Sequence, residues 1–87
     1  MPGVGRKIIV TAYMRWTRDD ATSDYDGVSG GDPPVRFTVF KMKDHWRLER
    51  RNGSHELCQS RRDAFALGDT RAMQANQPLL SKEPRYD

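Results

Sequence analysis

The chain has 87 residues, of which 31% are charged and 36% are hydrophobic, and its formal net charge is +3 at pH 7. A chain of this length supplies one small core, which excludes a second domain, and its hydrophobic content excludes a disordered chain. No apolar run approaches the length that crosses a bilayer, and the start of the chain lacks the apolar segment of a signal peptide. We therefore expect a single domain with no membrane partner.

The one cysteine, Cys58, has no second cysteine with which to form a disulfide within the chain. A reducing compartment follows from this, and we expect a cytoplasmic protein. The positive charge is concentrated in residues 36–63, which hold eight basic and four acidic residues, whereas residues 1–35 hold four basic and five acidic residues. A basic region of this kind steers an anionic partner.

Residues 7–17, KIIVTAYMRWT, alternate between two faces and predict one half-buried strand. The inward face of this strand would hold Ile8, Val10, Met14 and Trp16. The outward face would expose Ile9 and Tyr13.

Residues 18–34, RDDATSDYDGVSGGDPP, predict a long mobile loop between two strands, because aspartate, glycine, serine and proline interrupt regular structure. The aspartates also suggest a calcium-binding loop. Aligning Asp24, Asp26 and Gly27 with such a loop, however, puts Pro33 where a bidentate glutamate is required. The prediction is therefore a solvated loop without metal.

Residues 35–44, VRFTVFKMKD, carry apolar residues at both odd and even positions. This pattern indicates either burial on both faces of a strand or a bulge near Phe40. Residues 45–51, HWRLERR, alternate again and place Trp46 and Leu48 inward. Both segments are expected to be strands.

Asn52-Gly53 predicts a two-residue type I′ turn, because both residues tolerate the positive φ angles of that turn. The chain would then return as a last strand over residues 54–59, with Leu57 inward. These segments together form the expected basic hairpin.

Ser60-Arg61-Arg62-Asp63 is typical of a helix start, since the serine hydroxyl can accept a hydrogen bond from a free backbone N–H. The helix is expected over residues 61–75, before Pro78, and residues 77–87 are expected to form an irregular tail. The face packed against the sheet would hold Ala64, Phe65, Gly68, Ala72 and Ala75.

The expected order is strand, loop, three strands and helix. It predicts an α+β domain in which an antiparallel sheet of about four strands has one C-terminal helix packed on one face. The expected core consists of Ile8, Val10, Met14, Trp16, Trp46, Leu48, Leu57 and Phe65.

His45, His55 and Cys58 are the residues from which a zinc site or a Cys–His nucleophile could be built. Structural zinc requires four ligands at recognisable spacing, and the hairpin places His45 far from His55. No third residue that could orient a nucleophile is evident, and no glycine-rich phosphate loop lies between a strand and a helix. We expect no enzymatic activity, no metal and no cofactor.

The basic hairpin is the strongest functional signal, and its candidate nucleic-acid-binding residues are Lys43, Arg47, Arg50, Arg51, Arg61 and Arg62. Arginine suits phosphates and guanine edges, and a two-stranded ribbon fits the DNA major groove. Arg47 and Arg51 would project from one strand face, with the other arginines at the hairpin tip and helix start. Glu49 and Glu56 lie among these arginines, a mixture that a solvated face also shows.

The segment WRLERRNGSHELCQSRRDAFA joins a strand, an Asn-Gly turn, a second strand and a basic helix start. Over residues 36–75 the chain resembles the arm-binding domain of tyrosine recombinases, a three-stranded sheet with one helix that contacts DNA. It is also similar to short uncharacterised bacterial and phage proteins. The first resemblance implies DNA contact through Lys43, Arg47 and Arg51. The added strand over residues 7–17 and the absence of a catalytic domain depart from a recombinase and weaken that role, but they are compatible with a free-standing accessory protein.

A protein-binding role is the alternative: an inhibitor or adaptor of phage or mobile-element type that binds a host protein through its sheet or an edge strand. Exposed Ile9 and Tyr13 favour this role, because nucleic acid has less use for an aliphatic side chain. A structural part of a larger assembly is a third possibility. The expected partner is therefore DNA or RNA, or alternatively a host protein.

Overall fold

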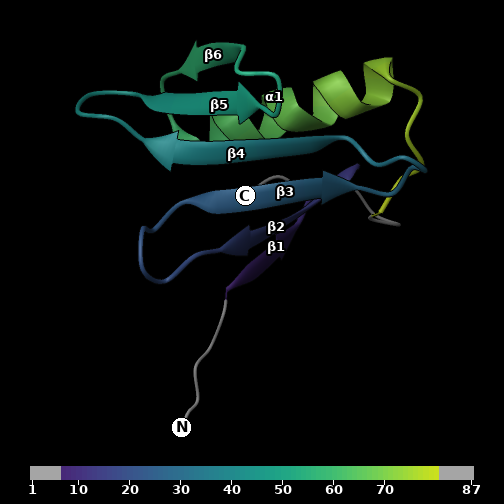
Figure 1. Ribbon diagram of the computed structural model, residues 1–87, viewed down its shortest axis with the longest axis horizontal. Coiled ribbons are helices and arrows are strands. Elements are labelled where there is room, and N and C mark those ends of the chain that lie inside the picture. Colours follow the sequence, from purple (N-terminus) through teal and green to yellow (C-terminus); the bar gives the residue numbers. More distant parts are fainter. Residues whose placement is uncertain (1–6, 81–87) are drawn as a thin grey trace, which may run out of the picture.

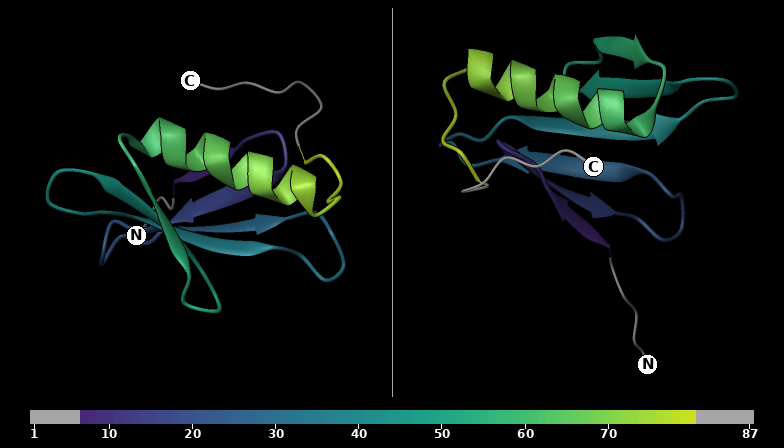
Figure 2. Two further views of the ribbon diagram at one scale, coloured as in Figure 1. Left: turned by 90° about the horizontal axis from the view of Figure 1, so that it is seen from above. Right: turned by 180° about the vertical axis from the view of Figure 1, so that it is seen from behind.

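The computed structural model describes residues 7–80, which form six strands and one helix (Figure 1). The elements are β1 (Ile8–Val10), β2 (Met14–Arg18), β3 (Tyr25–Ser29), β4 (Arg36–Lys41), β5 (Trp46–Arg50), β6 (His55–Cys58) and α1 (Arg61–Gln74). The strands lie in the sheet in chain order, and every neighbouring pair is antiparallel. Helix α1 packs on one face of the sheet (Figure 2). The predicted α+β class is confirmed, with six strands rather than about four.

The segment 7–17 is a hairpin rather than one strand. Thr11 donates its backbone N–H to the carbonyl of Met14, and the chain reverses between β1 and β2. The pairing places Ile9 opposite Trp16 on the core side, whereas Ile8 and Val10 lie on the other side. Ile8 and Val10 are 57% and 46% exposed, so the prediction that they are core residues was wrong.

The segment 18–34, predicted as a loop, contains strand β3. Glycine in a strand is unfavourable by propensity, but Gly27 is required here because an added Cβ would overlap the ring of Trp16 on the neighbouring strand. Tyr25 is 3% exposed and contacts Phe65 edge to face. Packing of a tyrosine and a glycine against two aromatic rings therefore outweighs the turn-forming composition.

Strand β4 is apolar on both faces without a bulge. Its register with β5 is continuous from Phe37 to Lys41. Phe37 and Val39 are buried on the helix side, and Phe40 is half-buried on the other side. Of the two alternatives for this segment, the structure shows the one in which apolar residues line both faces.

The turn between β5 and β6 has three residues, not two. Glu49 pairs with His55, so the loop consists of residues 51–53, and only Gly53 has a positive φ, of 91°. The additional residue shifts the register by one position, and such a shift moves every side chain to the opposite face. Leu57, predicted to be inward, is therefore 62% exposed and pairs with Arg47.

The core is centred on Trp16, which is fully buried between the sheet and α1. Phe65 stacks on it with ring centroids 4.6 Å apart, and a Cβ added at Gly68 would lie 2.7 Å from the indole ring. The core cluster consists of Met14, Trp16, Tyr25, Phe37, Val39, Leu48, Ala64, Phe65 and Ala72. Trp46, also predicted to be in the core, is half-buried and packs against this cluster.

Helix α1 begins and ends close to the predicted residues. The hydroxyl of Ser60 accepts the N–H of Asp63, and Ala75 is the C-cap. Asn76 has a φ of 61°, and the N–H of Gln77 returns to the carbonyl of Ala72, which closes the helix with a Schellman-type pattern. Residues 77–80 have no regular structure, and the rest of the predicted tail lies outside the described residues. No helix in residues 7–80 is long and apolar enough to cross a membrane.

Candidate nucleic-acid interface

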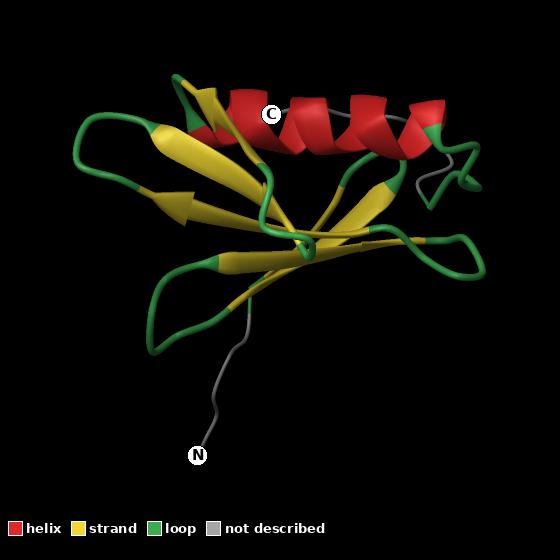
Figure 3. Ribbon diagram, turned by 45° about the horizontal axis from the view of Figure 1, so that its top comes forward, coloured by secondary structure: helices red, strands yellow, loops and turns green. Residues whose placement is uncertain are grey.

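The side of the sheet opposite α1 has no covering element among the described residues, and we call it the open face (Figure 3). Because neighbouring strands are antiparallel and in register, its side chains form rows that cross the strands. Three such rows lie next to one another on the open face, each two residues along the strands from the next. Each row has a different chemistry.

The first row, which we call the arginine row, consists of Arg15, Arg36 and Arg51. Arg36 pairs with Val28, and Val28 pairs with Arg15, so these two arginines lie two strands apart, a distance of about 10 Å. The pairing between β4 and β5 ends at Phe37 and Arg50, and Arg51 follows directly after this last pair; Arg36 and Arg51 both line one hollow. All three arginines are exposed, and none forms an ion pair within the described part of the chain.

The second row holds carboxylates and hydroxyls. Glu49 pairs with Thr38, Thr38 with Asp26, and Asp26 with Thr17. The Thr38 hydroxyl donates a hydrogen bond of 3.4 Å to Asp26, and Asp26 forms no ion pair with any residue that the structure describes. A hollow of about 430 Å³ lies between the first and second rows, and its lining includes Asp26, Arg36, Thr38, Glu49 and Arg51.

The third row holds Phe40, Arg47 and Leu57. The guanidinium of Arg47 lies 5.6 Å from the centroid of the Phe40 ring and donates a hydrogen bond of 3.1 Å to Glu49. The same nitrogen lies 3.1 Å from Nδ1 of His55. Arg47, a predicted DNA contact, is thus on the open face, although its charge is partly balanced by Glu49.

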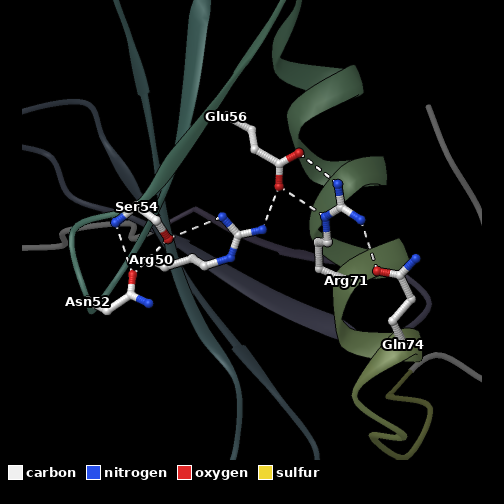
Figure 4. A network of polar contacts seen from close by, with 6 residues as sticks. All are labelled: Arg50, Asn52, Ser54, Glu56, Arg71 and Gln74. Atoms are coloured by element: carbon white, nitrogen blue, oxygen red, sulfur yellow. Dashed lines mark hydrogen bonds and ion pairs between the residues drawn. The ribbon is translucent and has the colours of Figure 1, made fainter.

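Arg50 is among the residues that line the hollow, but it does not belong to any of the three rows. It alternates to the helix side of the sheet, where its Nη2 lies 2.5 Å from Oε2 of Glu56 (Figure 4). Arg71 on α1 binds the same carboxylate with two hydrogen bonds, of 2.7 and 2.9 Å. The hydrogen bonds from Arg71 hold the pKa of Glu56 at about 2, well below its ordinary 4.5, and those from Arg50 act in the same direction.

Arg61 and Arg62 are also separate from the arginine row. Strand β6 leads away from the hairpin tip, so α1 begins at the far end, and the tip residues Arg51 and Asn52 lie near Ala75 at the other end of the helix. Fourteen helical residues span about 21 Å. Arg61 donates a hydrogen bond of 2.9 Å to the hydroxyl of Tyr25, and Arg62 is exposed in the first helical turn. The expected cluster of hairpin tip and helix start is therefore not formed.

The remaining predicted residues have mixed positions. Lys43 is exposed in the turn between β4 and β5, at the opposite end of β5 from Arg51. Ile9 and Tyr13, predicted to be exposed for a protein partner, are half-buried and pack against the core cluster. The backbone N–H of Tyr13 donates to the buried carboxylate of Asp69 on α1.

Arg15 and Arg36 are not among the residues that the sequence predicted for nucleic-acid contact. Both follow from the register of β2, β3 and β4, which could not be derived while β3 was assigned to a loop. The alternation of Arg36 with Phe37 in a strand was the available signal, because it places the arginine on the face opposite a buried aromatic residue.

The histidines and the cysteine are dispersed. His45 lies 2.7 Å from Asp44, whereas His55 contacts Arg47 on another strand. Burial raises the pKa of the Cys58 thiol, and the charges of Asp63 and Glu56 raise it further. No group of three or more histidine, cysteine, aspartate or glutamate residues within 7–80 is placed to hold a metal ion.

Comparison of the chain with protein-family models, with curated proteins and with solved structures found no significant match. The resemblance of residues 36–75 to the arm-binding domain of tyrosine recombinases therefore stays a prediction.

Proposed function

We propose that this protein is a non-enzymatic binding module that holds the phosphate backbone of a nucleic acid on its open face. The observation that carries the proposal is the arginine row. Arg36 and Arg51 line the same hollow, and their like charges repel each other when no anion lies between the two residues. Neither has a carboxylate partner among the described residues, so a phosphate from outside the chain would complete the site.

The chemistry of the row suits phosphate. Arginine presents a planar fork of donors that binds phosphate oxygens in pairs, and it stays charged at any physiological pH. Arg15 extends the row across β2, so an extended polyanion could contact all three guanidinium groups along a line across the sheet. Arg47 and Lys43 lie outside this line and would add attraction over a longer range.

Salt dependence tests the proposal. Binding of labelled random-sequence DNA and RNA, measured by fluorescence anisotropy across a salt series, should weaken steeply because each neutralised phosphate releases counterions. Arg36→Gln should reduce the slope of log K against log salt by about 0.7 to 0.9 for each phosphate contact that is lost.

Arg18→Gln is the matched control, since it removes the same charge from β2 but on the helix side, where Arg18 contacts Asp20 and Ser23. It should change the slope much less. Absence of binding to either nucleic acid at about 50 mM salt would refute the proposal, as would equal effects of the two variants.

A protein partner is the second candidate, favoured by the exposed apolar residues at both edges of the open face. Ile8 and Val10 on β1 and Leu57 on β6 are each at least 46% exposed, and each of these strands has one edge that pairs with no other strand of residues 7–80. Such an edge can pair with a strand of another protein. This role predicts that a protein retained from a host lysate stays bound at moderate salt, and that Val10→Asp reduces the retention more than Arg36→Gln does.

A further inference from the structure

We infer that the open face binds single-stranded nucleic acid rather than a duplex. The phosphates would lie along the arginine row, and a base carrying an exocyclic amino group would lie in the adjoining hollow. The inference rests on the proposed function and adds the form of nucleic acid and the base chemistry. The arrangement of the three rows leads to it.

The order of the rows across the open face corresponds to the order of phosphate and base in a nucleotide. Two residues along a strand span about 6.8 Å, so the second row lies one such step from the arginine row, and the third row lies two steps away. A nucleic-acid strand whose phosphates contact Arg51, Arg36 and Arg15 would place its bases over Asp26 and Thr38. The hollow of about 430 Å³ between these rows has a volume within the range of small-ligand sites.

The carboxylate of Asp26 determines which base is preferred in the hollow. Its carboxylate is exposed, accepts one long hydrogen bond from Thr38 and forms no ion pair with a described residue. A carboxylate beside a phosphate path repels the backbone, but it accepts hydrogen bonds from the amino group of cytosine. Thymine and uracil present a carbonyl oxygen at the corresponding position, which the carboxylate repels. Cytosine is therefore favoured over thymine and uracil.

The breadth of the sheet does not fit the DNA major groove. Six strands about 4.8 Å apart extend over about 24 Å, whereas the DNA major groove is about 12 Å wide and admits a two-stranded ribbon. Strand β5 has neighbours on both sides, so the hairpin cannot enter a groove as a free ribbon. The open face also carries Phe40 and Val28 among its arginines, and these apolar groups suit the exposed faces of unstacked bases.

The test measures anisotropy with labelled oligo(dC), oligo(dT), oligo(rC), oligo(rU) and a random-sequence duplex of equal length, at low salt and neutral pH. We expect single strands to bind more tightly than the duplex, and cytosine strands to bind about tenfold more tightly than thymine or uracil strands, as one charge-assisted hydrogen bond would provide.

The variant Asp26→Ala tests the base preference more directly than the wild-type comparison does. It should increase the affinity for oligo(dT), since a negative charge leaves the phosphate path, and at the same time abolish the preference for oligo(dC). Asp20→Ala is the matched control, because it removes the same charge from the turn before β3 and should leave the preference intact. Phe40→Leu should weaken oligo(dC) binding about fivefold or more while leaving an abasic strand unaffected.

The outcomes separate the inference from the proposed function. Salt-dependent binding in which the duplex equals the single strands, or in which Asp26→Ala leaves the ratio of oligo(dC) to oligo(dT) affinity unchanged, would overturn the inference and leave the arginine row as a phosphate site. Failure of every nucleic acid to bind at low salt would overturn both.

Discussion

Trp16 shows how single residues set the distance between helix and sheet. Its indole is fully buried between Gly27 on β3 and Gly68 on α1, and its Nε1–H donates a hydrogen bond of 3.1 Å to Thr11. A larger residue at either glycine would push the helix from the sheet or displace the ring. The two glycines are therefore explained by close packing rather than by backbone conformation.

Gly68→Ala should destabilise the protein by about 1 to 3 kcal/mol, the usual cost of overpacking, since the new Cβ would lie 2.7 Å from the indole. Helix propensity alone predicts the opposite sign, because alanine is favoured over glycine in a helix by about 1 kcal/mol. Chemical denaturation of the wild type and the variant measures the difference. A more stable variant would show that the side chains around Trp16 can rearrange at little cost in free energy.

The hairpins determine which face each side chain occupies. Alternation correctly predicted Met14, Trp16 and Leu48 as buried, because their spacing lies within one strand. It placed Ile8, Val10 and Leu57 on the wrong face because a turn of unrecognised length lies between them and the correctly placed residues. In the turn between β1 and β2, the Thr11 hydroxyl donates a hydrogen bond to Asp69 on α1, and a contact that joins residues 58 positions apart leaves no local signal in the sequence.

The ion-pair network on the helix side joins three elements, β5, β6 and α1. Glu56 on β6 accepts hydrogen bonds from Arg50 on β5 and from Arg71 on α1 (Figure 4). The one-residue shift at the turn is what brings Glu56 opposite Leu48 and toward the helix. The network thus links β6, an edge strand of four residues, to α1.

This network predicts a pH dependence of stability. The folded-state pKa of Glu56, about 2, lies below its ordinary 4.5, so the ionised form stabilises the fold above about pH 4.5, and this contribution is lost as the pH falls toward 2. Glu56→Gln should lower the melting temperature at pH 7, and its difference from the wild type should shrink steadily between pH 5 and pH 2. A difference that stays constant over this range would show that the carboxylate charge does not stabilise the fold.

The open face is a property of the whole molecule. A single helix of 14 residues covers one side of a six-stranded sheet, and no further element of residues 7–80 reaches the other side. The strands of that side carry Arg15, Arg36 and Arg47, joined by Arg51, against Asp26 and Glu49. The position of α1 thus determines which arginines face solvent together.

The sequence predicted an exposed sheet face that carries arginines, but not all of the arginines that lie on it. Arg47 and Arg51 were expected on an exposed sheet face, and both lie on or beside the open face. Arg50 and Arg61 could not be separated from them by composition, because only the register and the path of β6 show that they lie on the helix side. Arg36 was missed because its neighbours in space come from the segment read as a loop.

The most direct test of the arginine row is a nuclear magnetic resonance titration that follows the side-chain Nε–Hε signals of the arginines as a single-stranded oligonucleotide is added. We expect the signals of Arg15, Arg36 and Arg51 to shift together and saturate at one concentration, while those of Arg18 and Arg61 remain in place. Shifts confined to Arg61 and Arg62, with the arginine row unchanged, would place binding at the start of α1 and contradict the proposed function.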